Sequence, residues 1–64
     1  MNEDIIKGKW KQLKGNLKQI WGKLTDSDIE KIDGSYDKLI GKIQERYGHS
    51  KEQAEKECRE KCNF

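Results

Sequence analysis

Four lysines at helical spacing near the start of the chain are its most suggestive chemical feature. Steps of four, three and four residues separate them, which places them along one side of an α-helix. These residues, named here the lysine stripe, are Lys7, Lys11, Lys14 and Lys18. Residues 1–24 carry six lysines and two acidic residues, whereas residues 25–64 carry eight basic and ten acidic residues. A stripe of this kind can bind phosphate or anionic lipid, so it is the candidate anion or nucleic-acid surface.

Three interpretations of the lysine stripe are open at this point. Trp10 and Trp21 lie beside it, and an aromatic ring can stack on a base while lysines contact phosphates. A basic stripe can also hold a protein at an anionic membrane surface. The third interpretation is structural, because lysines border the apolar face of most amphipathic helices and both tryptophans belong to the apolar pattern. The stripe contains no arginine or asparagine to read base edges, so any nucleic-acid binding is expected to be weak and non-specific.

The residue types that most often catalyse reactions form no specific pattern. His49 is the only histidine and is expected in an exposed turn, with no spacing that brings a nucleophile and an orienting carboxylate to it. The glycines are spaced too widely to form a phosphate-binding loop. We therefore predict that the protein is not an enzyme, with no catalytic residue and no cofactor.

Metal binding is not indicated either. Cys58 and Cys62 together with His49 fall short of a four-ligand zinc site. The acidic run from Asp26 to Asp37 lacks the glycine turn and the distal glutamate of a calcium loop, and its first residues complement a helix N-terminus. Both cysteines are expected to be reduced, with Cys58 partly buried and Cys62 near a frayed end. A disulfide between two molecules under oxidation is left open.

The sequence contains an internal repeat of the elements that carry these residues. All six glycines fall into two triplets with steps of seven, and the second triplet follows the first by 26 residues. They are Gly8, Gly15, Gly22, Gly34, Gly41 and Gly48. The same offset pairs Trp10 with Tyr36 and several aliphatic residues with one another, which predicts an internal repeat of approximately residues 6–32 and 32–58.

Hydrophobic periodicity predicts four helices. Residues 3–21 form one amphipathic helix, and a capping box at Thr25–Asp28 begins a short second helix. Residues 36–47 form the third helix, and a second capping box at Ser50–Gln53 begins a charged fourth helix. The residues predicted to form the core are Trp10, Leu13, Leu17, Trp21, Ile32, Tyr36, Leu39, Ile43 and Tyr47. Those expected to turn toward it are Ile29, Ala54 and Cys58.

The glycines are expected to play three structural roles. Gly22 and Gly48 are predicted to end helices in the left-handed conformation, and Gly34 is predicted to terminate the second helix. Gly15 and Gly41 lie inside helices, where glycine costs about 1 kcal/mol relative to alanine. The close approach of another backbone would offset that cost, so close helix packing is predicted at both positions.

These elements predict an all-α fold. Four helices make two sequence-related helical hairpins, which pack into one small bundle because neither hairpin can bury its own apolar stripe. Residues 1–64 form a single domain. We see no signal-peptide pattern and no apolar run that could cross a membrane, and we expect a cytoplasmic protein that is a monomer or a weak homo-oligomer.

Four segments of the chain are distinctive: Trp10–Gly15, Trp21–Asp26, Asp37–Gly48 and Gln53–Lys56. Together they resemble the CsbD-like family of small bacterial proteins. The resemblance implies a cytoplasmic, non-catalytic protein associated with the general stress response. It also implies a fold of four helices in two packed hairpins, and it brings no active-site residues.

The function expected at this point is stress-associated and without turnover. The protein is predicted to act by binding or protecting a partner that the sequence leaves unknown. The alternative is weak, non-specific nucleic-acid binding through the lysine stripe, on Lys7, Lys11, Lys14 and Lys18.

Overall fold

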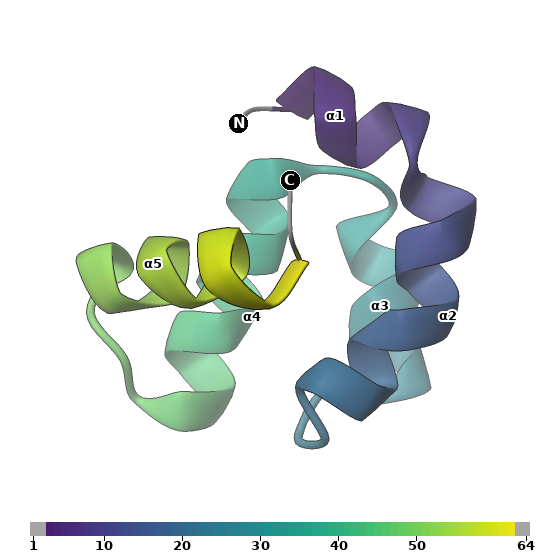
Figure 1. Cartoon of the computed structure of the whole chain (residues 1–64). Helices are drawn as coiled ribbons and strands as arrows, with labels where there is room; N and C mark the ends of the chain where they lie inside the picture. Colours follow the sequence, from purple (N-terminus) through teal and green to yellow (C-terminus); the bar gives the residue numbers. More distant parts are fainter. Residues whose placement is uncertain (1–2, 63–64) are drawn as a thin grey trace.

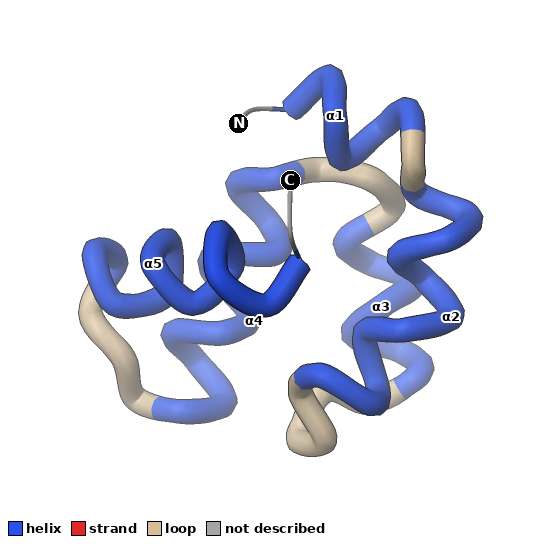
Figure 2. The backbone as a smooth tube through the Cα atoms, viewed as in Figure 1, coloured by secondary structure: helices blue, strands red, loops and turns tan. Residues whose placement is uncertain are grey.

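Helices account for nearly all of the described chain, which in this computed structural model is residues 3–62, with side chains described from Ile6 to Lys61 (Figure 1). Five helices follow one another: α1 (Glu3–Gly8), α2 (Trp10–Ile20), α3 (Asp26–Ile32), α4 (Tyr36–Tyr47) and α5 (Lys51–Cys62). Short loops join them, drawn in tan in Figure 2. The prediction of an all-α fold is confirmed for residues 3–62, and the difference from four helices lies at the N-terminus.

The predicted single helix over residues 3–21 is wrong, because the chain breaks between α1 and α2. Lys9 has φ −112° and ψ 17°, outside helical values, and no side chain caps α2. The break lets α1 dock against the turn after α3. Gly34 lies there with φ +80°, and a Cβ on it would stand 3.4 Å from Cγ and 3.6 Å from Cα of Lys7. A close backbone approach therefore occurs at Gly34, whereas the residue that ends α3 is Asp33, one position before the predicted Gly34, with φ +44°.

The five helices enclose one core. Figure 1 shows α2 beside α3 on one side of the molecule and α5 across α4 on the other. The two sides meet where α1 packs against α4 and α2 packs against α5, while α3 packs against α4. Whether the two sides are copies of one hairpin stays a prediction, although α2 and α4 begin at Trp10 and Tyr36, which the repeat pairs.

The core contains the predicted aliphatic residues and extends beyond them. Of the nine predicted core residues, three aromatic ones, Trp10, Tyr36 and Tyr47, are only partly buried and pack on its edge. The other six are buried, and Trp21 is completely shielded. The additional buried apolar residues are Ile6, Leu24, Ile29, Ile40, Ala54 and Cys58. The inward orientation predicted for Ile29, Ala54 and Cys58 is confirmed.

Helix ends are set by local side chains, as the sequence indicates. The backbone N–H of Asp28 donates to Oγ1 of Thr25 and the Thr25 N–H donates back to Oδ2 of Asp28, both at 3.1 Å, which confirms the first capping box. The Oγ of Ser50 accepts a hydrogen bond from the backbone N–H of Gln53 at 3.1 Å, which is one of the two hydrogen bonds of the second capping box. Gly48 ends α4 with φ +68°, as predicted.

Three glycine predictions are wrong. The residue that ends α2 is Trp21, with φ −123°, and the only glycines with positive φ in the described chain are Gly34 and Gly48. The left-handed cap predicted at Gly22 is therefore absent. A Cβ placed on Gly15 or Gly41 would meet nothing within 4 Å, so no neighbouring helix backbone is close to either.

No helix within residues 3–62 combines the length and the apolar character needed to cross a membrane.

Candidate nucleic-acid interface

The lysine stripe comes from two helices. Lys7 lies on α1, whereas Lys11, Lys14 and Lys18 lie on α2, and the break at Lys9 separates them. The prediction that all four share one side of a single helix is thus wrong for Lys7. All four side chains are exposed. The three on α2 follow one side of that helix over roughly 10 Å, at a rise of about 1.5 Å per residue.

One member of the lysine stripe is already paired. Nζ of Lys18 lies 2.9 Å from Oδ1 of Asp26, at the start of α3. Both side chains are more than half exposed, at 56% and 80%, so solvent screens this ion pair strongly. Among the side chains described from residue 6 to 61, no acidic group pairs with Lys7, Lys11 or Lys14. Within these described residues, the three lysines are therefore open to an anionic ligand.

The solvent side of α2 carries more than lysine. Leu13 and Leu17 are buried, and Gly15 lies opposite them at the centre of the exposed side. At about 100° per residue, the lysines fall on one flank of Gly15 and three amide side chains fall on the other. We name this surface the outward face of α2, consisting of Lys11, Gln12, Lys14, Gly15, Asn16, Lys18 and Gln19, all of them exposed. Sequence reasoning missed the amides, although the same helical spacing identifies them.

The two tryptophans considered above as a stacking platform differ in how far they are buried. Trp21 is completely buried, and its indole Nε1 donates a hydrogen bond to Oε1 of Glu57 at 3.2 Å. Trp10 is partly buried and packs on the core, where its Cγ is 3.7 Å from the Cβ position of Gly34. Base stacking on Trp21 is therefore excluded while the fold is intact.

His49 lies in the loop between α4 and α5, as predicted, but it is not an exposed loop residue. Its Nε2 is 2.8 Å from Oε2 of Glu57, and its side chain is 27% exposed. Its ring stacks on that of Tyr47, with 5.6 Å between the ring centroids. The hydroxyl of Tyr47 in turn accepts a hydrogen bond from the backbone N–H of Lys23 at 3.1 Å. His49 thus belongs to a structural cluster that joins α5 to the loop after α2.

Glu57 is the centre of that cluster. Burial alone would raise the pKa of its carboxyl, but the hydrogen bonds from Trp21 and Gln53 and the charges of His49 and Lys61 outweigh burial and hold the pKa below its ordinary value. The carboxylate is therefore ionised at neutral pH and serves as an acceptor inside the fold.

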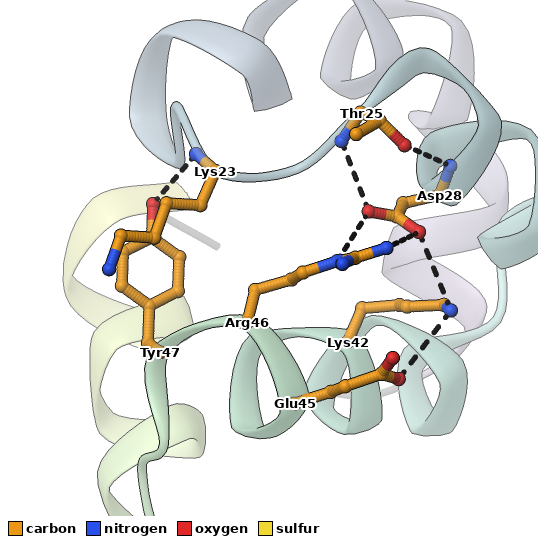
Figure 3. A network of polar contacts seen from close by, with 7 residues as sticks. All are labelled: Lys23, Thr25, Asp28, Lys42, Glu45, Arg46 and Tyr47. Atoms are coloured by element: carbon orange, nitrogen blue, oxygen red, sulfur yellow. Dashed lines mark hydrogen bonds and ion pairs between the residues drawn. The ribbon is translucent and has the colours of Figure 1, made fainter.

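A second polar network ties α3 to α4 (Figure 3). Arg46 reaches from α4 to Asp28, with Nε 2.8 Å from Oδ2 and Nη2 2.9 Å from Oδ1, and Nζ of Lys42 lies 3.5 Å from Oδ1. Asp28 is 2% exposed. The hydrogen bond from Arg46, followed by the one from the Thr25 backbone, holds the pKa of Asp28 well below its usual range. The acidic run expected only to complement a helix N-terminus thus also supplies an interhelical ion pair.

The remaining candidate groups have structural positions. Cys58 is completely buried in the core, so the prediction of partial burial is wrong, and the Cys62 side chain lies outside the described residues. No group of three or more histidine, cysteine or acidic side chains in the described chain could hold a metal ion. The described residues also form no pocket.

Comparisons with known proteins identify relatives of this chain. A family model described as CsbD-like matches residues 4–56. The UPF0337 protein PA4738 of Pseudomonas aeruginosa is 60% identical over 60 residues, which cover 94% of this chain and 92% of that protein. The UPF0337 protein YjbJ of Escherichia coli strain K12 is 61% identical over 57 residues, covering 89% and 83%. No solved structure shows significant similarity. The family match over most of the chain confirms the resemblance described above: the chain belongs to the CsbD-like family.

Proposed function

We propose that this protein acts in the bacterial stress response by binding, without turnover, and that its ligand is nucleic acid held weakly and non-specifically in the cytoplasm. The stress association comes from the resemblance to the CsbD-like family. The observation that carries the ligand assignment is the set of exposed lysines on α1 and α2 with no acidic partner among the described side chains: Lys7, Lys11 and Lys14.

The charge distribution supports this proposal. Between residues 5 and 24 every charged residue is a lysine, whereas the later helices mix both signs. Each lysine that neutralises a phosphate on a duplex releases condensed counterions, so affinity falls with salt at a logarithmic slope of about 0.9 per contact. Three contacts thus predict a modest affinity that is lost as the salt concentration rises.

The test compares charge reversal on and off the proposed surface. Fluorescence anisotropy with labelled DNA and RNA, from about 50 to about 200 mM salt, gives the affinity and its salt slope. The double variant Lys11→Glu/Lys14→Glu is expected to abolish binding. The control Lys38→Glu/Lys51→Glu changes the net charge by the same amount, at two exposed positions near helix N-termini where glutamate is tolerated. This control is expected to retain most of the nucleic-acid binding.

Two results would remove the proposal. One is no binding by the wild type at the lowest salt concentration, and the other is an equal loss in both double variants, which would mean that only net charge matters. Sedimentation with vesicles that contain anionic lipid, compared with neutral vesicles, tests the membrane alternative. Anionic vesicles binding in place of nucleic acid would assign the lysines to that alternative.

A further inference from the structure

We infer that the nucleic acid is a duplex lying against the outward face of α2, and that Gly15 is the point at which its phosphate backbone comes closest to the helix. This inference rests on the proposed function and deepens it, because it names the form of the ligand, the contact face and the residue that limits the approach.

The aromatic rings and the outward face of α2 favour a duplex over a single strand. Proteins that hold single strands without sequence preference stack bases on exposed aromatic rings. Here Trp21 is completely buried, and Trp10 is packed on the core edge. The outward face of α2 offers lysines and amides, which are the groups that contact phosphates and sugars on a duplex. It also contains no apolar side chain that could enter a lipid layer, so it lacks the feature that seats an amphipathic helix in a membrane.

The outward face of α2 also matches a duplex in its dimensions. An α-helix with its side chains is about 10–12 Å across, and the major groove of B-DNA is about 12 Å wide. The outward face of α2 carries lysines on one flank and Gln12, Asn16 and Gln19 on the other. The lysines and Gly15 can therefore follow one phosphate strand while the amides face the groove.

Gly15 has no role in packing within the described chain. Glycine is disfavoured inside a helix, and a Cβ at this position would meet nothing within 4 Å, so no intramolecular contact requires its absence. Gly41 on α4 is equally open, but its neighbour Lys42 is directed to Asp28 and Glu45. Gly15 instead lies among exposed lysines, three and four residues from Lys18 and Lys11. A phosphate drawn in by these lysines can reach the surface of the helix only where no side chain projects.

The experiment uses Gly15→Leu and Gly41→Leu as a matched pair, on the full chain. Both positions are exposed, a Cβ at either would meet nothing within 4 Å, and leucine is a good helix former, so circular dichroism is expected to show both variants folded. Affinity is measured for one duplex DNA fragment and for each of its single strands, with salt series. Gly15→Leu is expected to weaken duplex binding on the order of tenfold and to reduce the salt slope by about one, the effect of losing a phosphate contact. Gly41→Leu is expected to bind like the wild type, and the single strands are expected to bind less tightly than the duplex.

The outcomes separate this inference from the proposed function. If the wild type binds and Lys11→Glu/Lys14→Glu abolishes binding, but Gly15→Leu binds the duplex as well as Gly41→Leu does, the inference is overturned and the proposed function stands. Single strands that bind as tightly as the duplex overturn it in the same way. If the wild type binds no nucleic acid, or binds only anionic vesicles, both fail.

Discussion

Replacing the interior glycines of α2 and α4 by alanine is expected to stabilise this protein. Gly15 and Gly41 lie within helices with ordinary negative φ, and a Cβ at either position has no atom within 4 Å to displace. Alanine therefore removes backbone freedom from the unfolded chain and introduces no strain in the folded one. The packing role predicted from the sequence would instead have made both substitutions destabilising.

The magnitude follows from helix propensity. Glycine is about 0.8–1 kcal/mol worse than alanine in a helix interior, so each substitution is expected to raise the free energy of unfolding by close to that amount. For a domain of this size, 1 kcal/mol corresponds to about 4–8 °C in melting temperature. The sites lie on different helices, so the double variant Gly15→Ala/Gly41→Ala is expected to show nearly the sum.

Far-UV circular dichroism during urea and thermal unfolding measures these changes. Gly34→Ala is the opposing control, because Gly34 has φ +80° and the added Cβ would stand 3.4 Å from Cγ of Lys7. It is expected to be destabilising by more than 1 kcal/mol, the cost of the left-handed conformation alone. If Gly15→Ala or Gly41→Ala lowered the unfolding midpoint in the direction of Gly34→Ala, the reasoning from open space would be refuted.

Three further predictions concern polar groups inside the fold. Asp28→Asn is expected to lower the melting temperature at neutral pH, because it leaves Arg46 without its anion. The folded-state pKa of Asp28 lies below its ordinary value of 3.8. The stabilisation from Asp28 is therefore present above pH 3.8 and is lost as the pH falls through the folded-state pKa. Burial raises the pKa of Tyr36 to about 12, and the charge of Glu55 is the next largest cause. The stability that the neutral phenol confers is therefore complete below pH 10 and is lost as the pH rises toward 12. An absorbance titration of tyrosinate is expected to show a late step that Tyr36→Phe removes. Glu57→Ala is expected to cost about 1–3 kcal/mol in urea unfolding, because the buried indole N–H of Trp21 loses its acceptor.

Each of these predictions has a matched comparison. Asp26→Asn alters an ion pair whose partners are 56% and 80% exposed, so it is expected to change the melting temperature little. If Asp26→Asn and Asp28→Asn lowered the melting temperature equally, the role given to Asp28 would be contradicted. Tyr47→Phe is expected to keep the late titration step. Glu57→Gln retains an acceptor for the indole and is expected to be milder than Glu57→Ala, so equal losses would show that the hydrogen bond is unimportant.

Local signals in the sequence predicted the helix boundaries that depend on neighbouring residues. The capping box at Thr25–Asp28 and the left-handed Gly48 were found because the atoms involved lie within a few residues of one another. The break at Lys9 was missed because the apolar spacing continues through it. The chain changes direction at Lys9, where α1 docks on Gly34. Gly34 lies 27 residues after Lys7 in the chain.

The candidate surface was predictable only in part. The exposed lysines on α2 and the absence of acidic residues among them follow from spacing and composition. The burial of Trp21 as a hydrogen-bond donor does not, because its acceptor Glu57 lies 36 residues further along the chain. The pairing of Asp28 with Arg46 depends in the same way on how α3 meets α4, 18 residues apart. Contacts of this range are determined by the packing of whole helices, and no single-helix pattern encodes them.

The polar links of the segment from Trp21 to Asp28 bear on how the molecule unfolds. Three residues in this segment form hydrogen bonds with the second half of the chain: Trp21 donates to Glu57, the backbone N–H of Lys23 donates to Tyr47, and Asp28 accepts from Arg46. Closing the first of these loops brings the partners of the others close, so the entropy of loop closure is lost largely once for the set. Unfolding of this segment is then costly until all three contacts have separated. Slow hydrogen exchange in α2 and α4 is therefore expected to report the same global unfolding event. These links predict that residues 3–62 unfold as one cooperative unit, whatever the origin of the two halves.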